Sequence, residues 1–367
     1  GQSTYGNITA LAESPVNADV LYTGSDDGRV HVTRDGGATW TDVTDNFDDD
    51  VPARTYVTRI VASHGAEGTV FVAFDGHRTD DFAPYVFASR NHGEDWTRIT
   101  NGLPMSSVNA LAEHPDEADL LFVGNELGVY VLKDLGQSWV RMESNLPTVP
   151  VDDIKIHPRE NDLVLGTHGR GIWILDDVTP LEELDETVVQ SNAYLFPIRR
   201  ATSYNMYRPQ GWTPGIWEAE NPPYGARIRY WLGAAADDLT LRVTDATGNE
   251  LRELEGTAEA GLNEVIWDLR LTQEAPDGEA MNPGPRVMPG VYIVELTTGD
   301  DVVQQEMQVR MDPRVSMSRR ELMVRHDAMM QSYRLSGAVD VAEDALDEMA
   351  EQLGEVAGVL EDREGVD

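Results

Sequence analysis

Three segments of this chain repeat one short pattern: Asp or Asn, any residue, Gly, two residues, Trp. The residues that define it are Asp35, Gly37 and Trp40, then Asn91, Gly93 and Trp96, then Asp134, Gly136 and Trp139. In a hairpin turn, an Asp or Asn side chain accepts hydrogen bonds from backbone N–H groups about two residues further on, and Gly adopts a positive φ. We therefore interpret these nine residues as a structural turn motif. The Trp that ends it is expected to bury its ring between sheets.

The turns recur within a larger repeat of four short strands, which is the plan of a β-propeller blade. In the third unit the strands are expected at residues 108–112, 120–124, 128–132 and 139–142. A fourth unit matches at residues 151–158, 163–166 and 171–176, but it has no turn motif and no final Trp. We predict that residues 7–180 form four blades in an open arc. The fourth blade is expected to lack its outer strand.

The rest of the sequence predicts three further regions, a linker, a second β domain and a helical end, so that the fold is mainly β. After the blades (1–184), a packed linker rich in Pro, Gly and aromatic residues spans 185–225. Short strands about every ten residues then predict a β-sandwich over 226–312, with a long Pro-containing loop at 273–289.

Residues 313–367 predict a helical hairpin. Ser318 and Glu321 form a capping box, and a first helix is expected to end near Leu335, before Ser336 and Gly337. Apolar residues of the second helix alternate at spacings of four and three, which is typical of a coiled-coil seam. They are Ala342, Leu346, Met349, Leu353, Val356 and Leu360. The hairpin either packs on itself or on the sandwich, or it serves as an oligomerisation stalk.

Composition limits the partners. The formal net charge of −37 opposes binding to nucleic acids and anionic membranes, and it is typical of a halophilic protein or of weak Ca²⁺ binding. Cysteine is absent, which excludes disulfides and thiolate metal sites. No apolar run is long enough for a membrane span. Because the sequence starts at Gly1 almost directly in a blade strand, we expect it to be a C-terminal piece of a longer protein.

The turn motifs and the segment 166–177 (GTHGRGIWILDD) resemble the bacterial sortilin-like, neuraminidase-repeat (BNR or Asp-box) propeller proteins, often labelled glycosyl-hydrolase-like. Residues 221–226 (NPPYGA), with Trp267 and Asp268 later, are similar to the C-terminal part of the same proteins, an Ig-like domain of the flagellar hook-cap type. The resemblance implies an exported protein, secreted, periplasmic or on the cell surface, with further propeller blades upstream.

Two functions remain open. One is binding or scaffolding, with a glycan or a protein as ligand. The other is a glycoside hydrolase, which needs two carboxyl groups across a cleft, partly outside this sequence. Candidates near strand ends are Asp26, Asp27, Asp75, Glu126 and Asp153. A sialidase needs an arginine triad, and none of the available arginines lies in the Arg-Ile-Pro setting of that family. They are Arg54, Arg59, Arg78, Arg98 and Arg170.

His168 and Arg170 lie in a glycine-flanked loop and are the candidate ligand-binding residues, for an anion or a sugar. The alternative is a tight hairpin whose Arg pairs with a nearby Asp. The acidic run at residues 46–50 offers oxygen ligands for Ca²⁺ but lacks EF-hand spacing, and no other cofactor or metal site is expected. His114 and His157 hold matching positions before Pro, which indicates a structural turn role.

Overall fold

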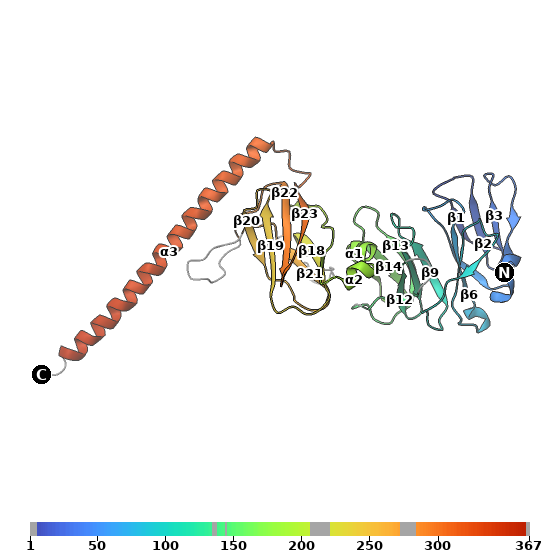
Figure 1. The fold of residues 1–367 in the computed structure, drawn as a ribbon, viewed down its shortest axis with the longest axis horizontal. Coiled ribbons are helices and arrows are strands. Elements are labelled where there is room, and N and C mark those ends of the chain that lie inside the picture. Colours follow the sequence, from blue (N-terminus) through green and yellow to red (C-terminus); the bar gives the residue numbers. More distant parts are fainter. Residues whose placement is uncertain (1–5, 134–137, 144, 206–220, 272–283, 365–367) are drawn as a thin grey trace. The chain divides into compact units, whose positions relative to one another are not determined.

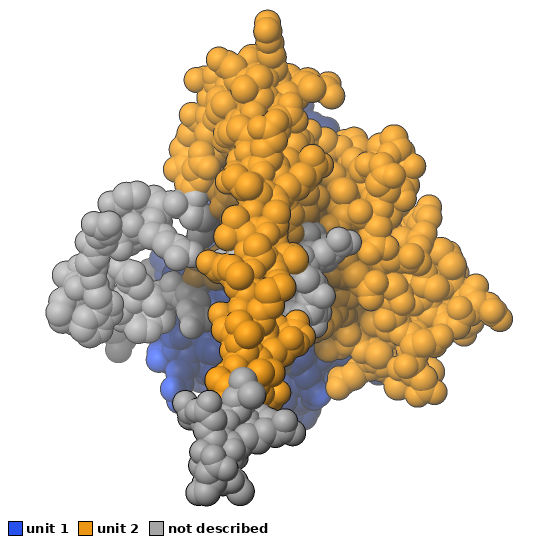
Figure 2. Space-filling view, turned by 90° about the vertical axis from the view of Figure 1, so that its left-hand side faces the viewer, with its two compact units in different colours: residues 1–182 blue, residues 183–367 orange. Residues whose placement is uncertain are grey.

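The computed structural model describes residues 6–133, 138–143, 145–205, 221–271 and 284–364. The chain divides into two compact units, Gly1–Glu182 and Glu183–Asp367, which are coloured separately in Figure 2. Asp134 and Gly136 of the third turn, and most of the predicted loop at 273–289, lie outside the described residues.

The first unit is built from four antiparallel sheets (Figure 1), three with four strands and one with three. The strands are β1 (Ile8–Glu13), β2 (Leu21–Ser25), β3 (Val30–Thr33) and β4 (Thr41–Asp42); β5 (Tyr56–Ala62), β6 (Val70–Asp75), β7 (Tyr85–Ser89) and β8 (Thr97–Arg98); β9 (Val108–Glu113), β10 (Leu121–Asn125), β11 (Gly128–Leu132) and β12 (Val140–Arg141); and β13 (Val151–Ile156), β14 (Leu163–Thr167) and β15 (Ile172–Leu175). In each sheet consecutive strands are neighbours. These are propeller blades, and the fourth has three described strands, as predicted.

Apolar residues on both faces of the middle strands hold neighbouring blades together. One cluster joins Val30 and Val32 of blade 1 to Val72 and Phe87 of blade 2. Similar clusters join blade 2 to blade 3 and blade 3 to blade 4. Burial of such side chains, at roughly 25 cal/mol per Å² of apolar surface, is what stabilises blade stacking.

Among the described residues, apolar side chains are exposed at both ends of this arc. Leu11 of β1 holds the place that Ile60, Leu111 and Ile154 hold in the later blades; those three are at most 7% exposed, whereas Leu11 is 65% exposed. At the other end, Ile172 of β15 is 73% exposed. The described blades therefore form an open arc, as the missing fourth turn motif predicted.

The first two turn motifs share one hydrogen-bond pattern. Asp35 Oδ1 accepts from the Thr39 backbone N–H at 2.8 Å, and Asn91 Oδ1 accepts from the Asp95 N–H at 2.9 Å. The motif side chain therefore accepts from the backbone N–H four residues further on, and not from one about two residues further on as expected. A hydroxyl two residues earlier, Thr33 or Ser89, accepts from the motif glycine and completes the turn.

The expected burial of the motif tryptophan is found in the third blade and not in the first. Trp139 is buried and donates from its ring N–H to the Ile99 carbonyl at 2.6 Å. Trp96 stacks on Phe47 with ring centroids 4.4 Å apart. Trp40 is 42% exposed. Trp139 of the third blade thus packs on the preceding blade, and Trp96 of the second blade packs on the segment that joins blades 1 and 2. No described residues of the first unit lie on the corresponding side of blade 1, so Trp40 stays exposed.

Two short 3₁₀ helices lie within the arc, η1 (Thr44–Asp50) and η2 (His77–Thr79). Two short α-helices follow it, α1 (Thr179–Glu183) and α2 (Glu186–Gln190).

The second unit contains two sheets around one core, which is a β-sandwich. Their strands are β16 (Ala193–Leu195), β17 (Ala201–Ser203), β18 (Ala226–Leu232), β19 (Leu239–Asp245), β20 (Glu250–Leu254), β21 (Gly261–Trp267), β22 (Gly290–Thr298) and β23 (Asp301–Met311). The strand orders are β16-β18-β21 and β17-β23-β22-β19-β20. Trp267 lies at the centre, fully buried, with its ring edge against Tyr292. The segment expected as a packed linker thus contributes β16 and β17 to the two sheets.

The C-terminal region is one helix, α3 (Arg319–Glu364), and not the predicted hairpin (Figure 1). Ser318 and Glu321 form the capping box, since the Ser318 N–H donates to Glu321 Oε2 at 2.7 Å. The helix continues through Ser336 and Gly337. A single interior Gly costs only about 1 kcal/mol relative to Ala, and the surrounding Ala, Leu and Glu residues favour helix.

Candidate functional site

One end of the propeller unit collects polar side chains from all four blades. It is the end at which the inner strands β1, β5, β9 and β13 begin, and we call it the front face. The strand registers place the β2–β3, β10–β11 and β14–β15 turns there, because Ile8 pairs with Ser25 and Val151 with Thr167. The motif turns lie at the opposite end. Loops at one end of a rigid scaffold are a common place for binding residues.

A network of hydrogen bonds crosses the front face from blade 2 to blade 4. Arg59 Nη2 of β5 lies 3.1 Å from Asp153 Oδ1 of β13 and donates to the Asp152 carbonyl at 3.0 Å. Asn109 of β9 donates to Glu126 Oε1 at 2.9 Å and to Asp152 Oδ1 at 3.5 Å. These contacts place one charged pair, two further carboxylates and an amide side by side at an exposed surface.

His168 extends this network. Its Nδ1 lies 3.3 Å from Asp152 Oδ2, and its side chain is exposed. The loop is a tight turn in which Gly169 and Gly171 have φ values of 79° and 73°. Among the described residues the Arg170 guanidinium has no ion pair, so the contact with an Asp that was expected of Arg170 is made by His168.

A second group on the front face belongs to blade 2. The Arg78 guanidinium lies over the Tyr56 ring, 4.5 Å from its centroid. Asp75 is buried. Its carboxylate accepts a hydrogen bond from the His77 backbone N–H at 2.9 Å and contacts Nδ1 of the His77 ring. The contact of Arg78 with Tyr56 is a cation–π contact, which holds the Arg78 guanidinium in place over the ring.

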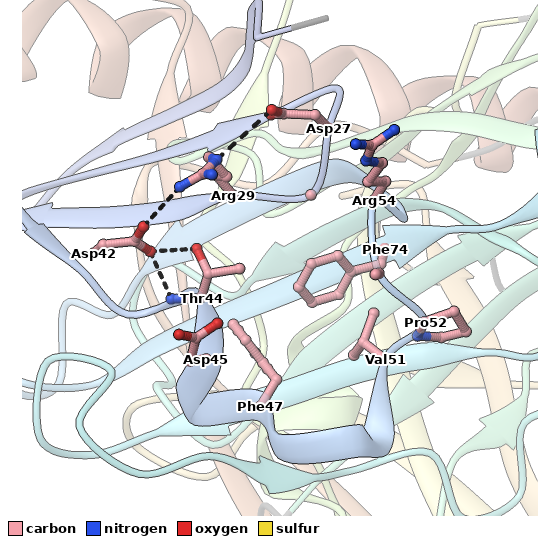
Figure 3. Close-up of a pocket in the computed structure, with 12 residues that line it drawn as sticks. Asp27, Arg29, Asp42, Thr44, Asp45, Phe47, Val51, Pro52, Arg54 and Phe74 are labelled. Atoms are coloured by element: carbon pink, nitrogen blue, oxygen red, sulfur yellow. Dashed lines mark hydrogen bonds and ion pairs between the residues drawn. The ribbon is translucent and has the colours of Figure 1, made fainter.

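A pocket of about 680 Å³ opens between blades 1 and 2 on the same face (Figure 3). Phe74 lines its interior, while Arg29 bridges Asp27 and Asp42 at its rim, with Arg29 Nη1 3.0 Å from Asp42 Oδ2. Arg54 also lines it and has a left-handed backbone, with a φ of 68°. A non-glycine residue in this region carries a strain cost, which is often found at ligand sites.

Two carboxyl groups on this face, those of Asp26 and Asp42, have lowered pKa values. Hydrogen bonds from the Asn7 side chain and the Gly6 N–H hold the pKa of Asp26 below its usual range. Burial alone raises the pKa of Asp42, but hydrogen bonds from Thr44 and the charges of His31 and Arg29 lower it on balance. A glycosidase acid needs a raised pKa, and the pKa shifts of Asp26 and Asp42 run in the opposite direction.

The other candidates fall elsewhere. His114 and His157 are turn residues, because each ring Nδ1 accepts the backbone N–H groups two and three residues further on. Asn46 of the acidic run donates to the Gly93 carbonyl at 2.7 Å. Among the described residues, no three His, Asp or Glu side chains are arranged to hold a metal ion. No described helix is long and apolar enough to cross a membrane.

Asn109 and Asp152 were missed from the sequence, although a signal existed. They hold the same repeat position, directly after the first residue of an inner strand, and their numbers differ by 43, the repeat offset. The matching residues Thr9 and Thr58 also point at the next blade, donating to the Val57 and Val108 carbonyls at 2.8 and 3.1 Å. Aligning the blades by position would have found this row.

No family model matches the sequence, and no curated protein matches it. Among solved structures, one described as YCF48 bound to D1 peptide is similar at 12% identity and a TM-score of 0.36, over 63% of this chain and 62% of that chain. PorZ, a surface component of the type-IX secretion system of Porphyromonas gingivalis, is similar at 14% identity and a TM-score of 0.29, over 82% of this chain and 51% of that chain. The chain therefore spans less than two thirds of the length of either structure.

Proposed function

We propose that this chain is a binding or scaffolding protein that takes a polar ligand, a glycan or a protein segment, on the front face of its propeller unit. The observation that carries the proposal is the network joining Arg59, Asn109, Asp152 and His168 across three blades. It offers paired donors and acceptors at a surface shaped by rigid strands. Hydroxyl and amide groups are the natural partners of such a surface.

A second candidate is a glycoside hydrolase. It is favoured by Glu126, Asp152 and Asp153, whose carboxylates share the front face. However, these carboxylates already contact Asn109, His168 and Arg59. Carboxylates engaged in this way suit ligand recognition better than proton transfer. Ligand binding without cleavage separates the two functions.

The test is a glycan array and a peptide array probed with the whole chain and with variants. His168→Ala and Asp152→Asn should each lower binding at least about tenfold, the effect of losing one or two charge-assisted hydrogen bonds. Arg90→Ala, at the opposite end of the blades, is the matched control and should bind normally. Equal binding by all variants would exclude the front face as the site.

We also propose that further propeller blades cover the open face of blade 1, where Leu11 and Trp40 are exposed. The support is internal, since the matching residues Ile60 and Trp139 are covered by the blade before them. Trp40→Ser should leave the melting temperature of the 367-residue chain nearly unchanged. In a longer chain that carries such blades it should lower the melting temperature, and no effect there would contradict the proposal. The resemblance to exported propeller proteins supports an extracytoplasmic location, which fractionation of the source cells would test.

A further inference from the structure

One face of helix α3 is apolar and uncovered along most of its length. At 3.6 residues per turn, the side chains of this face lie within about 100° of the helix circumference. They are Val324, Leu335, Val339, Leu346, Met349, Leu353 and Val356, and each is 48–69% exposed. We call this face the α3 stripe. It spans about 48 Å, at 1.5 Å per residue.

In the first half of the helix, the face opposite the α3 stripe is partly buried. Leu322 is buried, and Met329 and Tyr333 are half-buried. This half therefore already uses its other side for packing within the chain. The α3 stripe remains free on the described surface. Apart from Gln331, which lies on the same face between Val324 and Leu335, this exposed surface is apolar, and an exposed apolar surface of this kind marks an interaction site.

Charge along α3 is strongly separated. Residues 319–334 contain four Arg and two acidic residues, whereas residues 335–358 contain seven acidic residues and no Lys or Arg. The acidic half also lies toward the negative, C-terminal end of the helix dipole, where acidic side chains are unfavourable. The basic half of another such helix would complement it.

We propose that two copies of this chain associate through the α3 stripe as an antiparallel pair of helices. Antiparallel pairing centred near residue 340 sets Val324 of one copy beside Val356 of the other, and the Arg-rich half beside the acidic half. Parallel pairing would set the two acidic halves against each other, at a Coulomb cost. A twofold pair reuses one surface on both copies, as in most homodimers. It would also double the number of front faces, so that a ligand with repeated epitopes gains avidity.

Sedimentation equilibrium at about 0.5 M NaCl, which screens the net charge, tests the association. The whole chain should be a dimer. A variant with Leu346→Asp and Leu353→Asp should raise the dimer dissociation constant at least about 100-fold, because carboxylates would be buried in the stripe. Glu351→Gln, on the opposite face, should remain dimeric. A monomeric wild-type chain at about 100 µM would overturn the proposal.

Orientation is tested by disulfide trapping, which suits a chain without cysteine. Val324→Cys and Val356→Cys, one of them labelled with ¹⁵N, should form mixed disulfides when combined. Neither should cross-link with itself, because in the antiparallel pair identical residues lie about 48 Å apart. Glu351→Cys is the control that should not cross-link. Self-cross-linking of Val324→Cys and of Val356→Cys would mean a parallel pair and would refute the proposed orientation.

Discussion

Arg59 of the second blade reaches past the third blade to Asp153 of the fourth, with Nη2 3.1 Å from Oδ1. The two side chains are 38% and 52% exposed, so water screens their attraction. The contact therefore shapes the front face more than it stabilises the arc.

A double-mutant cycle with Arg59→Met and Asp153→Asn should measure this coupling. We expect about 0.2–1 kcal/mol in the free energy of unfolding, as for other exposed pairs, and less at high salt. Urea denaturation at two NaCl concentrations provides the measurement. A coupling above about 2 kcal/mol would show that the pair clamps the blades together.

Gly124 tests how closely the blades stack. A Cβ at this position would lie 2.6 Å from the Val151 carbonyl oxygen of the next blade. Gly124→Ala should therefore destabilise the first unit by about 1–3 kcal/mol, the usual cost of overpacking. Gly166 matches Gly124 in the fourth blade, and the nearest atom to its Cβ would be 3.5 Å away. Gly166→Ala should be neutral or slightly stabilising in the same denaturation experiment. Equal losses for both variants would contradict the open end of the arc.

Asp35 makes the first motif turn sensitive to acid. Hydrogen bonds from the Thr39 side chain and N–H lower the pKa of this carboxyl group from 3.8 to about 2. A lowered folded-state pKa adds stability above pH 4, and this stability is lost as the pH falls through about 2. Asp35→Asn keeps an acceptor, as Asn91 does in the second turn, and should lose less stability than the wild type between pH 4 and pH 2. Asp35→Ala should lower the melting temperature by a few degrees at pH 7. Identical pH profiles of wild type and Asp35→Asn would mean that the carboxylate does not stabilise the turn.

The formal charge of −37 should make stability depend on salt. Repulsion among carboxylates opposes the compact state, and the screening length falls from about 10 Å at 0.1 M to about 3 Å at 1 M salt. Differential scanning calorimetry should therefore show a melting temperature that rises between these concentrations, equally in NaCl and KCl. A flat or falling melting temperature would mean that local pairs already neutralise the carboxylates.

Local patterns predicted the blades well, because each strand is short and its register follows from neighbours in sequence. The strands at 226–232 and 239–245 also appear with the expected bounds. The helix break at Ser336 and Gly337 was wrong, since propensity there is outweighed by good helix formers on both sides. Trp40 differs from Trp139 for a reason outside its own turn, namely the lack of a covering blade.

The front face was only partly accessible from sequence. His168 was selected from its glycine-flanked loop, and the structure places it beside Asp152. The contact of Arg59 with Asp153 joins residues 94 positions apart, which no local pattern encodes. Acidic residues are also so frequent that Asp152 could not be distinguished from its neighbours by type alone.

The most direct test of the central claim is calorimetric titration of the whole chain with a ligand selected on the arrays, followed by mass spectrometry of the recovered ligand. We predict saturable binding, a loss of at least about tenfold in affinity with Asp152→Asn, and an intact ligand after prolonged incubation. Recovery of a shortened glycan would contradict the account and assign the front face to hydrolysis.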